Sequence, residues 1–220
     1  ALKSRTGVTA RPPWHFDPAS ARQMILSQFK IHDLNGFGLE NLPLAIGAVG
    51  CLLQYVKETQ KQALPHLQGI SVEKSDATVA LDGASRKNLE LDQHPSGYLR
   101  YTLFGVLNNT QTAMGSRHLR RWINLPLRCQ KTLHQRYQAI SALLGGGHYE
   151  ILQQSLKQVG DIERISTRIA LKSARPRDLI VLRHTLAALP DIQQLLTPLA
   201  GIARLKALAL AIGTQPEILT

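Results

Sequence analysis

The spacing of apolar residues constrains the fold of this chain most strongly, because it follows a helical period almost everywhere. From residue 82 to the C-terminal region, apolar side chains recur every three to four positions. Proline, glycine or short polar residues break this pattern at 94–97, 108–112, 126, 145–147, 176 and 190. The breaks predict six to eight helices after residue 82, so the chain is predicted to be mainly α-helical.

Two further helices are predicted in the first 66 residues. Asp17 followed by Pro18 is typical of an N-cap with proline at the first helical position, which predicts a helix over 18–29. Asn41 and Pro43 indicate the start of a second helix over 44–62. That second segment is apolar on nearly all sides as far as Val56, so we expect a buried helix and the longest one in the chain.

One segment has the period of a β-strand. Ile70, Val72, Val79 and Leu81 alternate with polar neighbours on either side of a polar stretch at 74–76. This alternation predicts a short β-hairpin over 69–81. Because an isolated hairpin is only marginally stable, we expect it to pack on helices.

Positive charge is abundant and unevenly placed. The chain has a formal net charge of +11, from 26 Lys and Arg against 15 Asp and Glu, and no acid occurs between Asp92 and Glu150. Such a balance favours a polyanionic partner such as nucleic acid. The shift in charge and pattern near His66 predicts a domain boundary there, giving domains 1–66 and 67–220.

The motifs of common enzyme and metal sites are missing from the sequence. The glycines at 36–38 and 145–147 lack the residues of a dinucleotide fingerprint or a phosphate-binding loop, and neither HExxH nor GxSxG occurs. Cys51 and Cys129 are too few and too far apart for a disulfide framework or a Cys-rich zinc site. With no apolar run of membrane-spanning length and no signal peptide, we expect a soluble intracellular protein without catalytic, cofactor or metal residues in this segment.

Two basic clusters are the remaining candidates for a binding site. In the first, at 115–122, helical spacing separates the arginines from Trp122, which we expect in the core. In the second, Arg164, Arg168 and Lys172 form an i, i+4, i+8 stripe opposite Ile165, another expected core residue. The stripe has two interpretations: contact with DNA phosphates, or a solvated face paired with nearby acids or another helix. We favour the second, because surface charges are usually solvated.

Several stretches, in order along the chain, resemble the bacterial mismatch-repair MutS family. They are RPPWHF at 11–16, DLNGFG at 33–38, GCLLQYVKETQ at 50–60, LPH at 64–66, RKNLE at 86–90, TAMGSRHLRRW at 112–122, DIERI at 161–165 and ARPRDL at 174–179. Together they cover residues 11 to about 190. The resemblance implies that 1–66 is the helical C-terminal part of an α/β connector domain, and that 67–220 is the first part of the helical core, or lever, domain.

The resemblance also implies a function and partners. MutS proteins recognise mismatched double-stranded DNA as homodimers and use ATP with Mg²⁺ to signal to MutL, in the bacterial cytoplasm at the nucleoid. The mismatch-reading and ATPase elements of the family lie outside this segment, so its expected role is non-catalytic: to transmit conformational change between DNA-binding and ATPase domains. The helix carrying Arg22, Gln23 and Met24 matches a connector surface used for MutL docking, although Met24 stands where a polar residue is expected.

Two alternatives remain open. The chain could be an independent basic helical module that binds nucleic acid through its arginine clusters, in which case tight binding by this segment alone would depend steeply on salt. It could also be an enzyme with an unrecognised site, which a turnover assay would establish.

Overall fold

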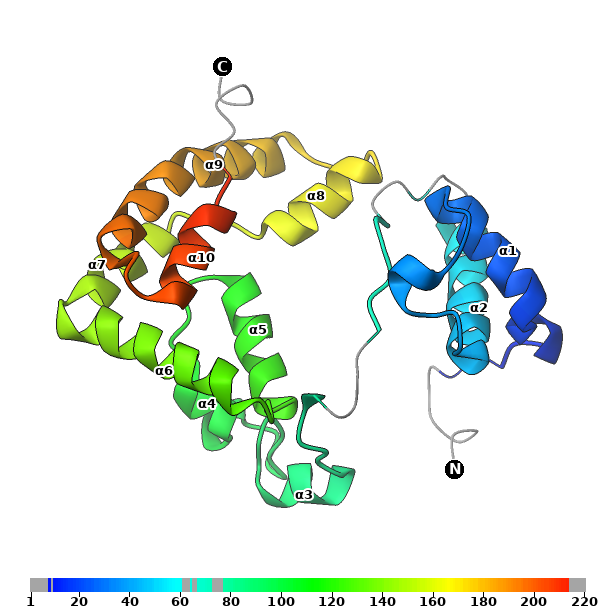
Figure 1. The fold of residues 1–220 in the computed structure, drawn as a ribbon, viewed down its shortest axis with the longest axis horizontal. Coiled ribbons are helices and arrows are strands. Elements are labelled where there is room, and N and C mark those ends of the chain that lie inside the picture. The colour runs from blue at the N-terminus through cyan, green and yellow to red at the C-terminus, as the bar shows by residue number, and fades with distance from the viewer. Residues whose placement is uncertain (1–7, 9, 61–63, 65–66, 73–76, 214–220) are drawn as a thin grey trace. The chain divides into compact units, whose positions relative to one another are not determined.

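The chain divides into two compact units. The structure is a computed structural model that describes residues 8, 10–60, 64, 67–72 and 77–213 (Figure 1). The units are Ala1–Glu73 and Lys74–Thr220, and this division falls a few residues after the boundary predicted near His66. Helices form both units and no extended strand occurs over the described ranges, so the predicted mainly α fold is confirmed.

The first unit is a pair of helices with short 3₁₀ turns. Its elements are η1 (Pro13–Phe16), α1 (Pro18–Phe29), η2 (Asn35–Phe37) and α2 (Pro43–Gln60). The predicted helix over 18–29 is confirmed: the Asp17 side chain accepts a hydrogen bond from the Ser20 backbone N–H at 2.9 Å. Lys30, in the left-handed conformation with φ 53°, ends the helix.

Glycines on α2 let α1 and η1 approach its backbone. A Cβ on Gly50 would lie 2.3 Å from the Cβ of Ala21, and a Cβ on Gly47 would lie 2.4 Å from the carbonyl oxygen of Phe16. Only glycine fits at these two contacts without a shift of the neighbouring backbone. The core around this contact consists of Ala21, Ile25, Leu34, Leu39, Ile46 and Leu53.

The expectation that α2 is buried on nearly all sides is wrong. Leu44 is 89% exposed and Leu52 is 60% exposed, because α1 and η1 cover only one side of the helix in the part of the unit that is described. Nor is α2 the longest helix: it has 18 residues, whereas α9 (Pro176–Leu196) has 21. Apolar composition overstated the burial of α2 because it does not say how many neighbours a helix has.

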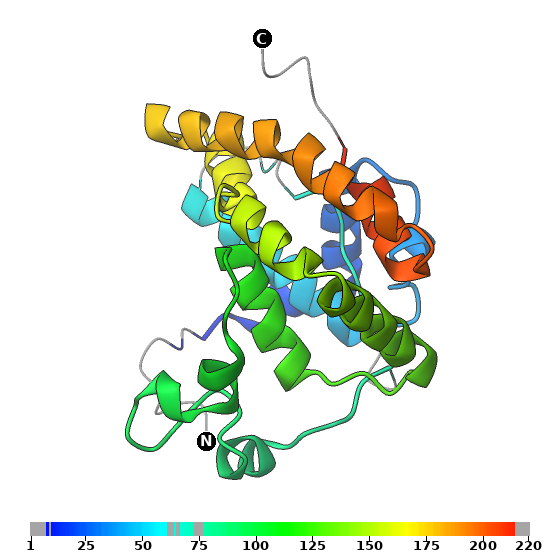
Figure 2. The ribbon, with the colours of Figure 1, turned by 90° about the vertical axis from the view of Figure 1, so that its left-hand side faces the viewer.

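The second unit is an array of helices (Figure 2). In this unit α9 packs against α7, α8 and α10, while α6 packs against α7 and α10. Its α-helices over the described residues agree with the six to eight predicted. They are α3 (Gly83–Asn88), α4 (Leu103–Leu107), α5 (Ala113–Asn124), α6 (Gln130–Gly145), α7 (His148–Leu156), α8 (Ile162–Ala170), α9 (Pro176–Leu196) and α10 (Ala203–Ala211), with 3₁₀ turns η4 (Leu99–Tyr101) and η5 (Thr197–Leu199).

The helix break predicted at Pro190 does not occur. Proline lacks the backbone N–H that would bond to the carbonyl four residues earlier, yet α9 continues through it to Leu196. Ala188, Ile192 and Leu196 are all buried on either side of the proline. We attribute the continuity to this packing, which opposes the local cost of proline.

The predicted hairpin over 69–81 is not confirmed. Its turn residues, 73–76, lie outside the described residues, and the described part of each arm forms no named strand. Thr78 instead makes an isolated antiparallel bridge with Leu127, and Ile70 and Val72 pack on the core of the first unit. The two arms belong to different compact units, and in the second arm the alternating residue Val79 is 44% exposed.

The two residues expected in the core of the second unit, Ile165 and Trp122, differ in how deeply they are buried. Ile165 is 2% exposed, which confirms it as a core residue. Trp122 is only half-buried, and α5 has no buried residue at all. The guanidinium of Arg136 covers one face of the Trp122 ring at 3.6 Å from its centroid, so a cation takes the place expected for apolar neighbours.

Candidate functional site

The residues expected to dock MutL lie on α1 with unequal exposure. Gln23 is exposed, whereas Arg22 and Met24 are half-buried. Arg22 Nη2 donates to Glu40 Oε1 at 2.7 Å, and Met24 packs against the core of the first unit. Of the three residues, Gln23 is the most exposed.

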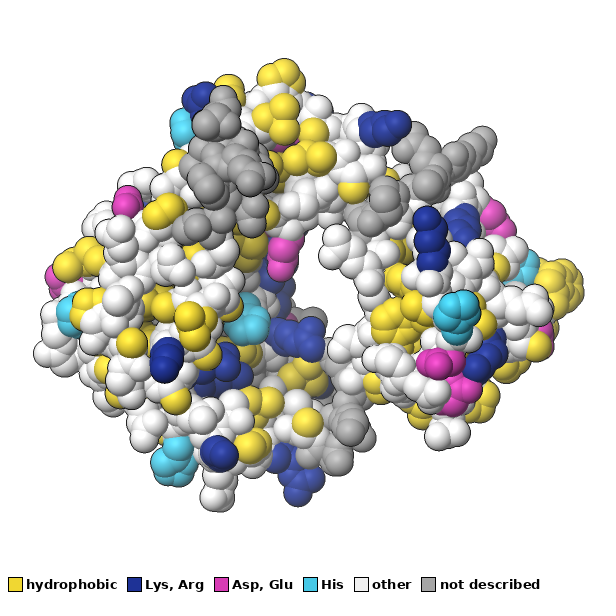
Figure 3. Space-filling view, turned by 45° about the horizontal axis from the view of Figure 1, so that its top comes forward, with side chains coloured by type: hydrophobic (Ala, Val, Ile, Leu, Met, Phe, Trp, Pro, Cys, Tyr) yellow, Lys and Arg dark blue, Asp and Glu magenta, His cyan; other side chains and the backbone are white. Residues whose placement is uncertain are grey.

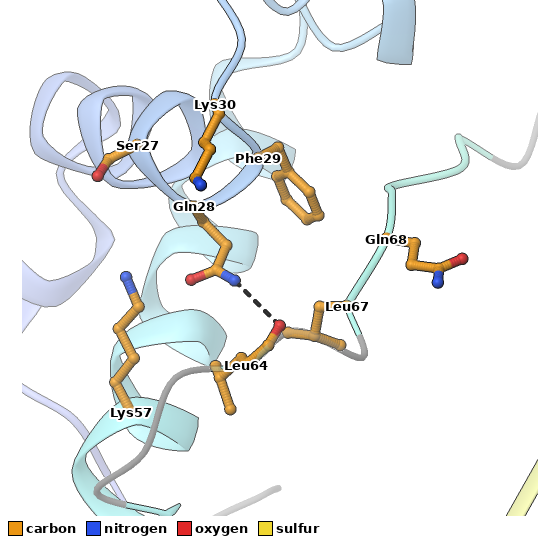
Figure 4. A pocket seen from close by; sticks show the side chains of 8 residues that line it. All are labelled: Ser27, Gln28, Phe29, Lys30, Lys57, Leu64, Leu67 and Gln68. Carbon is orange, nitrogen blue, oxygen red and sulfur yellow. Dashed lines mark hydrogen bonds between the residues drawn. The ribbon is translucent and has the colours of Figure 1, made fainter. Parts of the chain in front are cut away.

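A shallow hollow lies beside the ends of α1 and α2 (Figure 4). Its volume is about 630 Å³. The side chain of Gln28 donates from Nε2 to the carbonyl oxygen of Leu64 at 3.2 Å, and Lys30 and Lys57 reach the same hollow from the two helices. Among the described residues that line the hollow, none is a carboxylate, a histidine or a cysteine.

The basic stripe predicted on α8 is not a continuous helical face. Lys172 lies beyond the end of α8 at Ala170 and has a left-handed backbone with φ 53°. Arg168 donates to Asp178 from Nε at 3.0 Å and from Nη2 at 2.7 Å. Arg164 is largely exposed, with its Nε 3.5 Å from Asp161 Oδ2. These contacts favour the interpretation of paired and solvated charges.

Asp178 joins α8 to the start of α9. Besides accepting from Arg168, its carboxylate accepts from the backbone N–H of Arg175 at 3.0 Å, at the N-terminus of α9. These two contacts, the backbone one first, lower the pKa of Asp178. The Arg168–Asp178 pair therefore fixes the turn between the two helices.

Arg117 connects α5 to α8. Its Nη1 and Nη2 donate to the two carboxylate oxygens of Asp161 at 2.8 Å each, and Nη2 also donates to Glu163. Asp161 is the N-cap of α8, where it accepts from the backbone N–H of Arg164. The hydrogen bonds from Arg117 are the main reason that the pKa of Asp161 lies below its ordinary value.

Further arginine contacts surround α5. Arg120 lies with its guanidinium carbon 4.5 Å from the centroid of the Phe104 ring, and its Nε is 3.8 Å from Asp92 Oδ2. Asn124 donates to the same Asp92 oxygen at 3.1 Å. In the face drawn in Figure 3, basic side chains are scattered over each unit without forming a continuous band.

One cationic cluster was not predicted from the sequence. Arg136 on α6 stacks on Trp122, and Arg204 on α10 is close enough to lower the pKa of Arg136, although burial of the guanidinium lowers it more. The available signal was the stretch from Asp92 to Glu150, which contains arginines and no intervening acid. Sequence alone could not say which of those arginines would lack an acidic partner.

No cluster of three or more His, Cys, Asp or Glu side chains able to hold a metal ion occurs among the residues that the structure describes. Both cysteines are free thiols; Cys51 is buried and Cys129 is exposed. Over the same described parts of the chain, no helix combines the length and the apolar character needed to cross a membrane.

Comparison with protein families identifies both parts of the chain. A model described as MutS domain II matches residues 1–68, and a model described as MutS domain III matches residues 84–214. The two matches follow one another in the order of their numbering, and the second alone covers more than half of the 220 residues. The chain belongs to the MutS family.

Proposed function

We propose that this chain is the connector and lever segment of a MutS-like mismatch-repair ATPase, and that it transmits conformational change between DNA-binding and ATPase domains. The observation that carries this proposal is the succession of matches to MutS domains II and III. The proposed segment is non-catalytic. Its ATP, Mg²⁺ and mismatched double-stranded DNA would be bound by other parts of a homodimeric MutS-like protein.

The contacts between helices suit a lever. Transmission requires packed elements that move as rigid bodies and have discrete arrangements. Arg117 ties α5 to the N-cap of α8, and Arg168 ties α8 to the N-terminus of α9. From there α9 runs for 21 residues, or about 31 Å at the rise of an α-helix. A displacement of α5 would thus reach the far end of α9 through two bidentate ion pairs.

MutL docking on the first unit is part of the same proposal. Because Glu40 already pairs with Arg22, we assign the exposed Gln23 the main polar contact with MutL, and Met24 a supporting role inside α1. The replacement Gln23→Ala should weaken MutL binding, whereas Gln111→Ala, at a half-buried site in the other unit, should leave it unchanged. Equal binding by both variants would remove Gln23 from the docking surface.

The decisive experiment is a titration of this chain with homoduplex and with a G·T mismatch at one fixed salt concentration. We expect no ATP hydrolysis and equal, weak, salt-sensitive affinity for both duplexes, with Kd of order 10⁻⁴–10⁻⁶ M. A preference above about tenfold, or about 1.4 kcal/mol, would show that mismatch reading resides in this segment. Tight binding to both duplexes would instead favour an independent nucleic-acid-binding module.

A further inference from the structure

Thr185, in the middle of α9, is a polar side chain that is fully buried. It is 0% exposed, whereas Arg183 and His184 on the same turn of the helix are exposed. The Thr185 hydroxyl donates to the carbonyl oxygen of Val181 at 2.8 Å and accepts from the backbone N–H of Gly160 at 2.8 Å. A buried hydroxyl is costly unless it is hydrogen-bonded, and these two bonds remove that cost. The second bond joins α9 to the segment between α7 and α8.

The segment between α7 and α8 approaches α9 most closely at Gly160. A Cβ on this glycine would lie 2.3 Å from Val181 Cγ1 and 3.3 Å from Thr185 Oγ1. The approach therefore requires glycine, because any larger residue would push the segment away from α9. The hydroxyl of Thr185 and the missing side chain of Gly160 are two separate features of the sequence that fix the same point of contact.

Asp161, the next residue along the chain, is the acceptor of Arg117. Its carboxylate accepts two hydrogen bonds of 2.8 Å from the Arg117 guanidinium, and it also caps α8 through the backbone N–H of Arg164. Consecutive Cα atoms are held about 3.8 Å apart across a rigid peptide plane, so a displacement of Gly160 also displaces Asp161. The contact of α5 with the N-cap of α8 is therefore one residue away from the contact with α9.

We propose that Thr185 is a positioning residue: its hydroxyl holds the Gly160–Asp161 segment where Arg117 can bind it, so that a movement of α9 makes or breaks the contact between α5 and α8. This route reaches the middle of α9, whereas the ion pair of Arg168 reaches its N-terminus. The coupling deepens the proposed lever and rests on that proposed function for its biological use. Because it is measured without DNA, ATP or MutL, the coupling can fail while the lever role stands, and the reverse.

A double-mutant cycle between Arg117 and Thr185 tests this coupling. Arg117→Gln breaks the contact with Asp161, and Thr185→Val removes the hydroxyl but keeps a branched side chain. Trp14→Phe leaves Trp122 as the only indole, so its emission follows urea unfolding of the second unit. We expect the loss in the folding equilibrium constant caused by Arg117→Gln to be at least about threefold smaller in the Thr185→Val background than in the parent. Thr185→Ser, which keeps the hydroxyl, should restore the full loss.

Thr197→Val is the matched control for this cycle. The Thr197 hydroxyl also donates to a carbonyl one turn earlier, that of Gln193, but the Thr197 side chain is exposed. The effect of Arg117→Gln should be unchanged in this background. An equal effect of Arg117→Gln in Thr185→Val and in the parent would overturn the proposal, and so would an equal reduction in Thr197→Val. A reduction that Thr185→Ser shares would assign the coupling to packing of the methyl group and would also overturn it.

Gly160→Ala tests the same contact from the other side, and it decides the question if Thr185→Val loses helical circular dichroism. The new Cβ meets Val181 and should push the segment off α9, so the effect of Arg117→Gln should again fall at least about threefold. Adding Val181→Ala removes the Cγ1 atom that the new Cβ meets, and should restore the effect. A full effect of Arg117→Gln in Gly160→Ala alone would overturn the proposal.

Discussion

The two units of this chain are held together in different ways. In the first unit, α1 packs directly on the glycines of α2, and one cluster buries six apolar side chains. In the second unit, which is longer, the described core cluster around α6, α9 and α10 contains three buried residues: Ala139, Leu196 and Leu205. Arginine side chains make many of the remaining links between its helices, as at Arg117, Arg120, Arg136 and Arg168.

This difference has mechanical consequences. Apolar packing at close backbone distance tolerates little displacement, since cores are as dense as organic crystals. Ion pairs between partly exposed side chains can lengthen, exchange partners and respond to salt. We therefore expect the first unit to move as one body, and the helices of the second unit to move as separate rigid bodies that switch between discrete arrangements at their arginine contacts.

The largest expected effect is in the first unit. Ile25 is 0% exposed, so Ile25→Ala removes buried apolar volume and should lower the free energy of unfolding by about 2–5 kcal/mol. Amide hydrogen exchange should accelerate in α1 and α2 and stay unchanged in α9. The control is Leu52→Ala, at a site 60% exposed, which should cost within about 0.5 kcal/mol. Similar losses in both variants would contradict the assigned core.

Replacing glycine by alanine should change the free energy of unfolding in opposite directions in the two units. In Gly50→Ala the new Cβ meets Ala21, and overpacking of about 1–3 kcal/mol should exceed the gain in helix propensity of up to about 1 kcal/mol. Gly145, the last residue of α6, has no atom within 4 Å of its Cβ position, so Gly145→Ala should raise stability by up to about 1 kcal/mol. Urea denaturation measures both. Stabilisation by Gly50→Ala would show that the helices can separate without cost.

The contact between Arg117 and Asp161 should make a pH-dependent contribution to the free energy of unfolding. The lowered pKa of Asp161 means that the pair stabilises the fold above the ordinary Asp value of 3.8, and that this stability is lost as pH falls through the lower folded pKa. Arg117→Gln should therefore be less stable than the parent at pH 7. This gap, the difference in free energy of unfolding between the two proteins, should close below about pH 4. Trp122 fluorescence during urea unfolding, in the Trp14→Phe background, follows the helix that carries Arg117.

Two controls separate the contacts of Arg117 with Asp161 and Glu163 from the effects of other carboxylates. Asp17, Asp82 and Asp178 also have lowered pKa values, and they are present in both proteins, so they cancel in the difference. The gap should shrink with added salt, because the Arg117 side chain is 39% exposed. A gap that is the same at pH 7 and at pH 2 would mean that Arg117 acts through packing alone.

Local signals in the sequence predicted where helices form better than they predicted which elements pack against each helix. Asp17 and Pro18 defined the start of α1 because capping depends on adjacent residues. The prediction that α2 is buried on nearly all sides failed. Its exposed Leu44 and Leu52 differ from its buried Leu53 only in whether another helix covers them. The helical period could not show that packing would carry α9 through Pro190.

The candidate site was less predictable than the fold, because pairing of charges is a tertiary property. The i, i+4 spacing of Arg164 and Arg168 was correct on α8, but Asp178 reaches Arg168 from the next helix. Arg136 gave no local signal, since its contact with Trp122 joins two helices and its unpaired Nε depends on the residues around both. The family resemblance supports the proposed function, but it could not assign these pairings.

The smallest effect is expected at Arg164, and it tests the two interpretations of the basic stripe. Arg164→Gln should change stability within about 0.5 kcal/mol, because its side chain is 70% exposed and its contact with Asp161 is 3.5 Å long. Arg168→Gln should destabilise measurably more, since it breaks both hydrogen bonds to Asp178. For duplex DNA, Arg164→Gln should reduce the weak affinity no more than Arg183→Gln does. If Arg164 contacts a phosphate, its replacement should lower the salt slope by about one while Arg183→Gln leaves the slope unchanged, and the stripe would then be a DNA-binding face.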